Sequence, residues 1–104
     1  IRGFAFREPL TCGSVTEFTI ETNKPVTEEK VNSAVKVAAK GPLKGIIEYS
    51  TDELVSTDIL GNPHSAIFDS KLTTVIDKKF LHVVAWYDNE WGYSSRMVDM
   101  IKIL

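Results

Sequence analysis

The stretch Phe80–Tyr87, with the polar residues that follow it, limits most strongly what this chain can fold into. Apolar residues occupy both faces of its alternating pattern, with Phe80, Val84 and Trp86 on one face and Leu81, Val83, Ala85 and Tyr87 on the other. The pattern therefore predicts a strand that is buried on both faces.

A helical pattern follows this strand almost at once. From Tyr93 onward the apolar residues recur at intervals of three and four, at Met97, Val98, Ile101 and Leu104. Asp88, Asn89 and Glu90 therefore lie at the end of a strand and just before a helix. An amide at such a place donates and accepts hydrogen bonds at once, so Asn89 can hold another amide in a fixed orientation. We expect function at this junction.

The rest of the chain has short strand patterns around one central helix. The pattern predicts strands over residues 1–8, 15–22, 46–49, 65–68 and 72–76. Thr27 is the expected N-cap of a helix that ends at Gly41-Pro42. Between Leu54 and Pro63 the pattern weakens, and we expect only brief strand pairings there, by Val55, Ile59 and Leu60.

This order of elements predicts an α+β fold. We expect a mixed, mainly antiparallel sheet with a central helix (about 27–40) and a C-terminal helix (about 92–104). A doubly wound nucleotide-binding fold is not expected, because strands and helices do not alternate strictly and no Gly-x-Gly-x-x-Gly occurs. The chain begins with Ile1 inside a strand pattern, which predicts that it is a piece of something longer.

Composition excludes several classes of partner. The 104 residues carry a formal net charge of -2, so no basic footprint for nucleic acid or for an acidic membrane is present. No apolar run approaches the roughly twenty residues that span a bilayer, and we expect a soluble, cytoplasmic protein. The single cysteine agrees with a reducing compartment.

Three candidate sites emerge from the residue types. Cys12 with His64 or His82 suggests a nucleophile and its base, but the acidic neighbours Glu8 and Glu17 should raise the pKa of this thiol, which favours an unreactive cysteine. The two histidines are too far apart in sequence for a metal site, so we expect none.

Arg7 follows small residues on its strand face, where it is free to bind phosphate or carboxylate, or to pair with an acid nearby.

The junction and several other segments resemble one enzyme family, phosphorylating glyceraldehyde-3-phosphate dehydrogenase. The similar segments are Phe4-Ala5-Phe6-Arg7, residues 38–46 (AAKGPLKGI), residues 54–58 (LVSTD), residues 64–69 (HSAIFD), and residues 86–96 (WYDNEWGYSSR) with Val98-Asp99. The resemblance covers nearly the whole chain. It implies that residues 1–104 form the C-terminal portion of the catalytic domain, without the nucleotide-binding domain and without the segment that carries the nucleophile.

The resemblance also implies roles for particular residues. Arg7 would bind the inorganic phosphate that attacks the thioester, Asn89 would hydrogen-bond the nicotinamide carboxamide of NAD or NADP, and Tyr93 would lie beside the nicotinamide. Independently of the resemblance, Asp58 and Asp69 are possible interface charges if the chain offers its sheet for assembly. No catalytic residue is expected in this chain, because the family's Ser-Cys-Thr-Thr-Asn segment does not occur in it.

The implied whole enzyme converts glyceraldehyde 3-phosphate, phosphate and NAD(P) to 1,3-bisphosphoglycerate, and is a cytoplasmic homotetramer with its C-terminal helix packed against the nucleotide-binding domain. This chain alone is then expected to be inactive. Two alternatives remain open: a fragment of the related erythrose-4-phosphate dehydrogenase, and a non-catalytic assembly module that offers its sheet to a partner.

Overall fold

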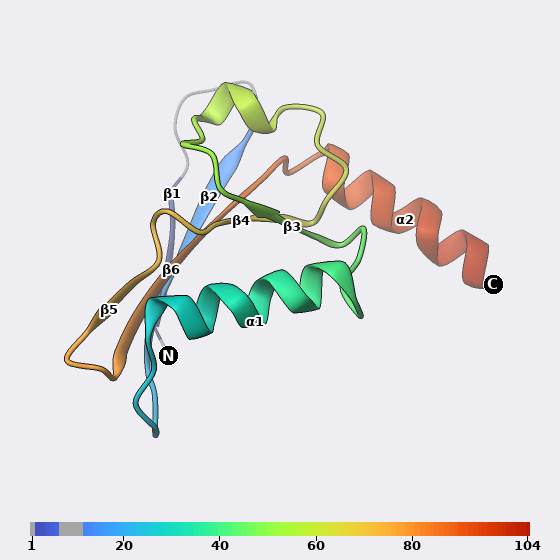
Figure 1. The fold of residues 1–104 in the computed structure, drawn as a ribbon. Helices are drawn as coiled ribbons and strands as arrows, with labels where there is room; N and C mark the ends of the chain where they lie inside the picture. Colours follow the sequence, from blue (N-terminus) through green and yellow to red (C-terminus); the bar gives the residue numbers. More distant parts are fainter. Residues whose placement is uncertain (1, 7–11) are drawn as a thin grey trace.

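The fold is an α+β arrangement in which two helices accompany one mixed sheet (Figure 1). The computed structural model describes residues 2–6 and 12–104, and for residues 2 and 4–6 only the backbone. The elements in chain order are β1 (Arg2–Phe6), β2 (Ser14–Glu21), α1 (Glu28–Lys40), β3 (Ile47–Ser50), the 3-10 helix η1 (Ser56–Ile59), β4 (Ala66–Asp69), β5 (Thr74–Ile76), β6 (Phe80–Tyr87) and α2 (Trp91–Ile103). The predicted fold class is confirmed, and both predicted helices lie within one residue of their observed bounds.

β6 is the central strand of the six-stranded sheet. The order along the sheet is β1-β2-β6-β4-β3, and β5 also pairs with β6. β2 runs antiparallel along the whole of β6, from Ser14 opposite Tyr87 to Glu21 opposite Phe80. On its other side β6 pairs with β4 at one end and with β5 at the other, both antiparallel, whereas β3 pairs with β4 in parallel. Leu81 and Val84, on opposite faces of β6, are buried, whereas Phe80 is exposed, so the predicted burial of both faces holds within the strand but not at its start.

The core is small and is drawn from three elements, β6, β4 and η1. The buried apolar side chains are Ile59, Ile67, Phe68, Leu81 and Val84. Ile59 is fully buried, although it belongs to η1 and not to a strand. The expected strand pairings of Val55, Ile59 and Leu60 are thus wrong, because this segment turns as a 3-10 helix and packs inward through Ile59.

α1 lies beside β3 across the lower part of the molecule in Figure 1. Its start is capped as predicted, since Thr27 Oγ1 accepts a hydrogen bond from the N–H of Lys30 at 3.3 Å. Its end is closed by the N–H of Gly41, which donates to the carbonyls of Val37 and Ala38. No residue of α1 is fully buried, so this helix leaves much of its surface to solvent.

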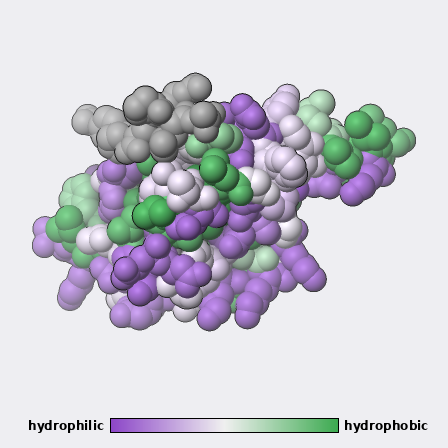
Figure 2. Space-filling model, turned by 90° about the horizontal axis from the view of Figure 1, so that it is seen from above, coloured by the Kyte–Doolittle hydropathy of each residue, from purple (hydrophilic) through white to green (hydrophobic). Residues whose placement is uncertain are grey.

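α2 projects away from the sheet (Figure 1). Its large side chains are mostly exposed, among them Trp91, Tyr93, Met97, Val98, Met100, Ile101 and Ile103. Figure 2 shows hydrophobic residues gathered at this projecting end. None of the helices in the described part of the chain is long and apolar enough to cross a membrane.

Gly92 anchors the start of α2 to the rest of the molecule. It is buried, and a Cβ at this position would lie 2.7 Å from the carbonyl oxygen of His64. One turn later, Arg96 donates hydrogen bonds to the carbonyl of Gly45 at 3.1 Å and to Ser65 Oγ at 3.2 Å. The helix is therefore held at its first turns, and its later turns project away from the sheet (Figure 1).

Candidate functional site

The junction between β6 and α2 is organised by the carboxylate of Asp88. Its Oδ1 accepts hydrogen bonds from the N–H groups of Glu90 and Trp91, both at 2.9 Å, as an N-cap residue does at a helix start. Its Oδ2 accepts from the N–H of Gly61 at 2.8 Å, and Cys12 Sγ donates to Oδ1 at 2.9 Å. One carboxylate thus joins the end of β6, the start of α2, the loop after η1 and the segment before β2.

This carboxylate is strongly stabilised in its charged form. Burial of Asp88, which is 5% exposed, would alone raise the pKa of the carboxyl group. The hydrogen bonds from Cys12 and from the N–H groups of Trp91, Gly61 and Glu90 outweigh burial, and they hold the pKa of Asp88 far below its usual range. The site therefore contains a fixed negative charge at neutral pH.

Gly61 adopts a conformation that this arrangement requires. Its φ is +77°, in the left-handed region that glycine enters without strain. That turn directs its N–H toward Asp88. A side chain at residue 61 would therefore meet backbone strain although the space around the position is open.

Asn89 is oriented by the segment that precedes β2. Its Oδ1 accepts a hydrogen bond from the N–H of Gly13 at 3.1 Å, and Cys12 Sγ lies 3.6 Å from the same oxygen. A backbone N–H can only donate, so the contact identifies the amide oxygen and leaves the Nδ2 group pointing elsewhere. Within the described part of the chain, Nδ2 has no hydrogen-bond partner, and Asn89 is exposed. Its amide thus offers two donor hydrogens to a ligand.

Asn89 and Tyr93 line one pocket of about 290 Å³ together with Ser65, Tyr87, Asp88, Gly92 and Arg96. This volume lies near the lower end of the range of about 300–1,000 Å³ that is usual for ligand pockets. It suits part of a ligand, such as one ring, better than a whole dinucleotide. The structure therefore brings two of the predicted site residues to the same pocket.

The other predicted site residues are placed differently. Arg7 lies outside the described residues. Asp69 is 2% exposed, and its Oδ2 accepts a hydrogen bond from Trp86 Nε1 at 3.1 Å, whereas Asp58 is exposed and caps η1 through the N–H of Val55 at 2.8 Å. A role for both at an interface stays a prediction, for which Asp58 is the better placed.

Cys12 does not pair with a histidine. His64 Nδ1 lies 3.2 Å from Glu48, and His82 Nδ1 lies 3.2 Å from Glu17 across the β2–β6 ladder. The hydrogen bond to Asp88 is the main cause that raises the pKa of the Cys12 thiol. The expected direction is confirmed, but its cause is Asp88, which the sequence did not place near Cys12.

Metal ligands do not gather in the described part of the chain. No three His, Cys, Asp or Glu side chains there lie close enough together to hold an ion. The polar groups at the junction are instead hydrogen-bond donors and acceptors held in place by backbone contacts. Such an arrangement can orient a ligand amide, and its one thiol, Cys12, is a poor nucleophile because Asp88 raises the pKa of this thiol.

Comparison with known proteins identifies the family of this chain. The family described as the C-terminal domain of glyceraldehyde 3-phosphate dehydrogenase matches residues 1–89. A glyceraldehyde-3-phosphate dehydrogenase of Mycobacterium avium is 53% identical over 102 residues, which are 98% of this chain and 30% of that protein. The testis-specific enzyme of Mus musculus is 48% identical over 104 residues, which are 100% of this chain and 24% of that protein.

A third relative, from Kitasatospora aureofaciens, is 49% identical over 104 residues, and the chain covers 31% of its length. The chain thus spans less than a third of the curated relatives it matches. The family match takes in the whole sheet, including β6 and the strand end with Asp88 and Asn89. The chain belongs to the family of the C-terminal domain of glyceraldehyde-3-phosphate dehydrogenase.

Proposed function

We propose that this chain is the C-terminal portion of the catalytic domain of an enzyme that oxidises glyceraldehyde 3-phosphate, with inorganic phosphate and NAD or NADP, to 1,3-bisphosphoglycerate. The named relatives are all glyceraldehyde-3-phosphate dehydrogenases, which favours this substrate over erythrose 4-phosphate. The observation that carries the proposal is the fixed amide of Asn89 at the pocket beside Tyr93.

Asn89 would hold the carboxamide of the nicotinamide ring. Its Oδ1 is already occupied by the N–H of Gly13, so its Nδ2 group is the one that remains to donate to the carboxamide oxygen. The cofactor supplies the hydride acceptor when bound. An amide anchored at one end by a backbone N–H keeps the ring from turning over, and so determines which face of the ring meets the substrate.

The surroundings of Asn89 support this role. Asp88 ties residue 89 to the start of α2 through the N–H groups of Glu90 and Trp91, and Cys12 bridges Asp88 and Asn89 from the other side. The charge of Asp88 lies next to the place proposed for the nicotinamide ring, which is positive in the oxidised cofactor. A fixed carboxylate favours that charged form.

Other residues would act around this centre. Arg7 would bind the attacking phosphate, Tyr93 would lie beside the nicotinamide ring, and Asp58 would contribute to a subunit contact in a homotetramer. The exposed apolar side chains of α2 suit packing against the nucleotide-binding part of the enzyme. Because the proposed nucleophile and nucleotide-binding domain lie outside residues 1–104, this chain by itself should not catalyse the reaction. We further propose that the whole enzyme is cytoplasmic.

The proposal is tested by assaying the full natural protein for reduction of NAD and of NADP with either aldehyde. We expect turnover of glyceraldehyde 3-phosphate that requires phosphate and exceeds turnover of erythrose 4-phosphate. Faster turnover of erythrose 4-phosphate would favour the related dehydrogenase. Absence of reduction of both cofactors with both aldehydes would favour an assembly module instead.

Arg7→Ala tests the phosphate role separately. We expect a weaker apparent affinity for phosphate with an intact burst of acylation, because the arginine would act only after the thioester has formed. Lys24→Ala removes an exposed cation elsewhere and is the matched control. An unchanged dependence on phosphate in Arg7→Ala would refute this assignment.

A further inference from the structure

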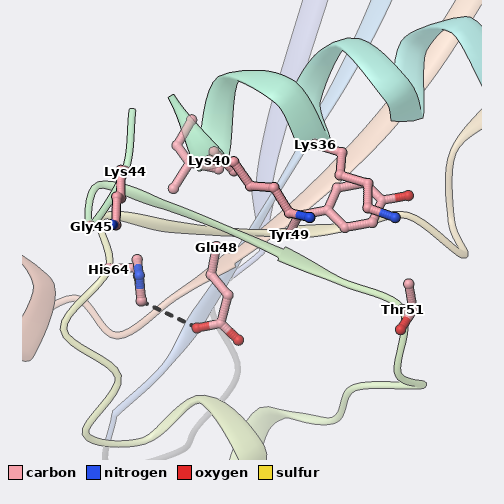
Figure 3. A pocket seen from close by; sticks show the side chains of 10 residues that line it. Lys36, Lys40, Lys44, Gly45, Glu48, Tyr49, Thr51 and His64 are labelled. Carbon is pink, nitrogen blue, oxygen red and sulfur yellow. Dashed lines mark ion pairs between the residues drawn. The ribbon is translucent and has the colours of Figure 1, made fainter. Parts of the chain in front are cut away.

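A second, positively charged groove lies between the last turns of α1 and strand β3 (Figure 3). It has a volume of about 590 Å³. In Figure 3, Lys36 and Lys40 extend from α1 toward Tyr49 of β3, with Lys44 and His64 at one end. None of the residues that line this groove lines the pocket of Asn89, so the two sites are separate.

The floor of the groove is held firmly. The ring of Tyr49 stacks on Phe68 with centroids 5.9 Å apart and an interplanar angle of 19°. Lys36 Nζ lies 5.7 Å from the centre of the same Tyr49 ring, in the range of a cation–π contact. The ring of Tyr49 is thus held by Phe68, and its contact with Lys36 keeps the ammonium group of Lys36 at the groove.

The lysines of the groove are not neutralised within the described part of the chain. No carboxylate there forms an ion pair with Lys36, Lys40 or Lys44, and all three are exposed. The one acid of the groove, Glu48, has other partners: its Oε2 accepts from Asn62 Nδ2 at 2.8 Å and lies 3.2 Å from His64 Nδ1. The groove therefore keeps an excess of positive charge.

The spacing of the lysines indicates the kind of anion that fits. Lys36 and Lys40 are one helical turn apart, about 6 Å along the helix axis, and Lys44 follows beyond the turn that closes α1. Lysine binds phosphate as a mobile point charge, so successive lysines suit a ligand with several linked negative groups. We propose that this groove binds an oligophosphate, a chain of two or more linked phosphoryl groups.

The test measures binding of anions to the full natural protein, saturated with NAD, by calorimetry at two salt concentrations. Tripolyphosphate is the probe, with orthophosphate and adenosine triphosphate as further ligands. The groove variant is Lys36→Gln/Lys40→Gln/Lys44→Gln. The control is Lys24→Gln/Lys30→Gln/Lys79→Gln, which removes three exposed lysines that do not line the groove.

We expect tripolyphosphate to bind the natural protein more weakly at higher salt, and to bind the groove variant about tenfold more weakly than the natural protein, as three lost exposed charge contacts predict. The control variant should lose less than about twofold. If the phosphates of a nucleotide are the natural ligand, adenosine triphosphate should show the same losses of affinity in the two variants as tripolyphosphate. Binding of tripolyphosphate alone would identify an inorganic chain as the ligand.

Two outcomes would overturn the proposal: no binding of tripolyphosphate to the natural protein, or equal losses in the groove and control variants. Orthophosphate separates this site from the proposed phosphate site at Arg7. Its binding should be the same in the groove variant and in the natural protein. Failure of the Arg7 assignment would therefore leave the tripolyphosphate result unaffected.

Discussion

Replacing Asp88 by asparagine should destabilise the protein far more than the loss of one charge on its surface. The two side chains have the same shape, so the change removes no packing. In the natural protein the N–H of Gly61 lies 2.8 Å from Oδ2 of Asp88. If the amide oxygen of the asparagine takes the place of Oδ1, its Nδ2 group takes the place of Oδ2 and faces this N–H. Two donors then meet, and a buried donor without an acceptor costs about 1–3 kcal/mol.

The remaining contacts of Asp88 also weaken in this variant. Oδ1 accepts hydrogen bonds from Cys12, Glu90 and Trp91, and bonds to a neutral oxygen are worth roughly half of those to a carboxylate. Because effects that share one group do not add, we expect a total loss of about 3 kcal/mol in the free energy of unfolding at pH 7.

The stability difference between the natural protein and Asp88→Asn should depend on pH in a definite direction. The pKa of Asp88 in the folded protein lies below that of the unfolded chain, so the carboxylate contributes stability above the unfolded pKa of about 3.9 and loses it as the pH falls toward the folded pKa. The difference between the natural protein and Asp88→Asn should thus be constant from about pH 5 to 8 and shrink below about pH 4.

Denaturant unfolding of the full natural protein at several pH values measures both quantities. Asp52→Asn is the matched control, because Asp52 is exposed and its loss should change stability by less than about 0.5 kcal/mol. A cost for Asp88→Asn no larger than that of this control would show that the carboxylate does not hold the junction together.

Three further substitutions follow from the packing, each measured as the free energy of unfolding. Gly92→Ala should destabilise by about 1–2 kcal/mol although alanine favours helices, because its Cβ meets the carbonyl oxygen of His64; a stabilised variant would contradict the close approach. Ile59→Ala should cost about 3 kcal/mol at a fully buried site, and a cost under about 1 kcal/mol would show that η1 is not part of the core. Trp86→Phe should cost about 1–3 kcal/mol because it leaves Oδ2 of the buried Asp69 without its hydrogen-bond donor, while Oδ1 keeps the N–H of Lys71, and a neutral effect would argue against the Trp86 hydrogen bond.

The sequence predicted the regular elements well, because their signals are local. Thr27 and Gly41 determine the ends of α1, and the apolar alternation of residues 80–87 predicted a strand, β6, with buried residues on both faces. The burial of Ile59 could not be predicted in this way. A 3-10 helix of four residues is too short to display a period, and its inward direction depends on the loops that join it to β3 and β4.

The contacts of Cys12 were missed for a different reason. Cys12 and Asp88 are 76 residues apart in sequence. They meet because β2 pairs antiparallel with β6 in a register that places Ser14 opposite Tyr87. Knowledge of that register would have located residues 12 and 13 beside residues 88 and 89, but apolar alternation predicts which face a residue lies on and not which strands are neighbours.

The proposed hydrogen bond from Asn89 to the nicotinamide carboxamide can be measured by comparing two ligands. ADP-ribose lacks the nicotinamide of NAD, including its carboxamide, and carries a hydroxyl group in its place, and the two ligands are otherwise the same. We expect Asn89→Ala in the full natural protein to bind NAD about five- to tenfold more weakly than the natural protein does, because one hydrogen bond is lost. The affinity for ADP-ribose should be unchanged, and Asn23→Ala, at an exposed asparagine, should alter neither. An unchanged affinity for NAD, or an equal loss of affinity for both ligands, would show that Asn89 does not bind the nicotinamide carboxamide.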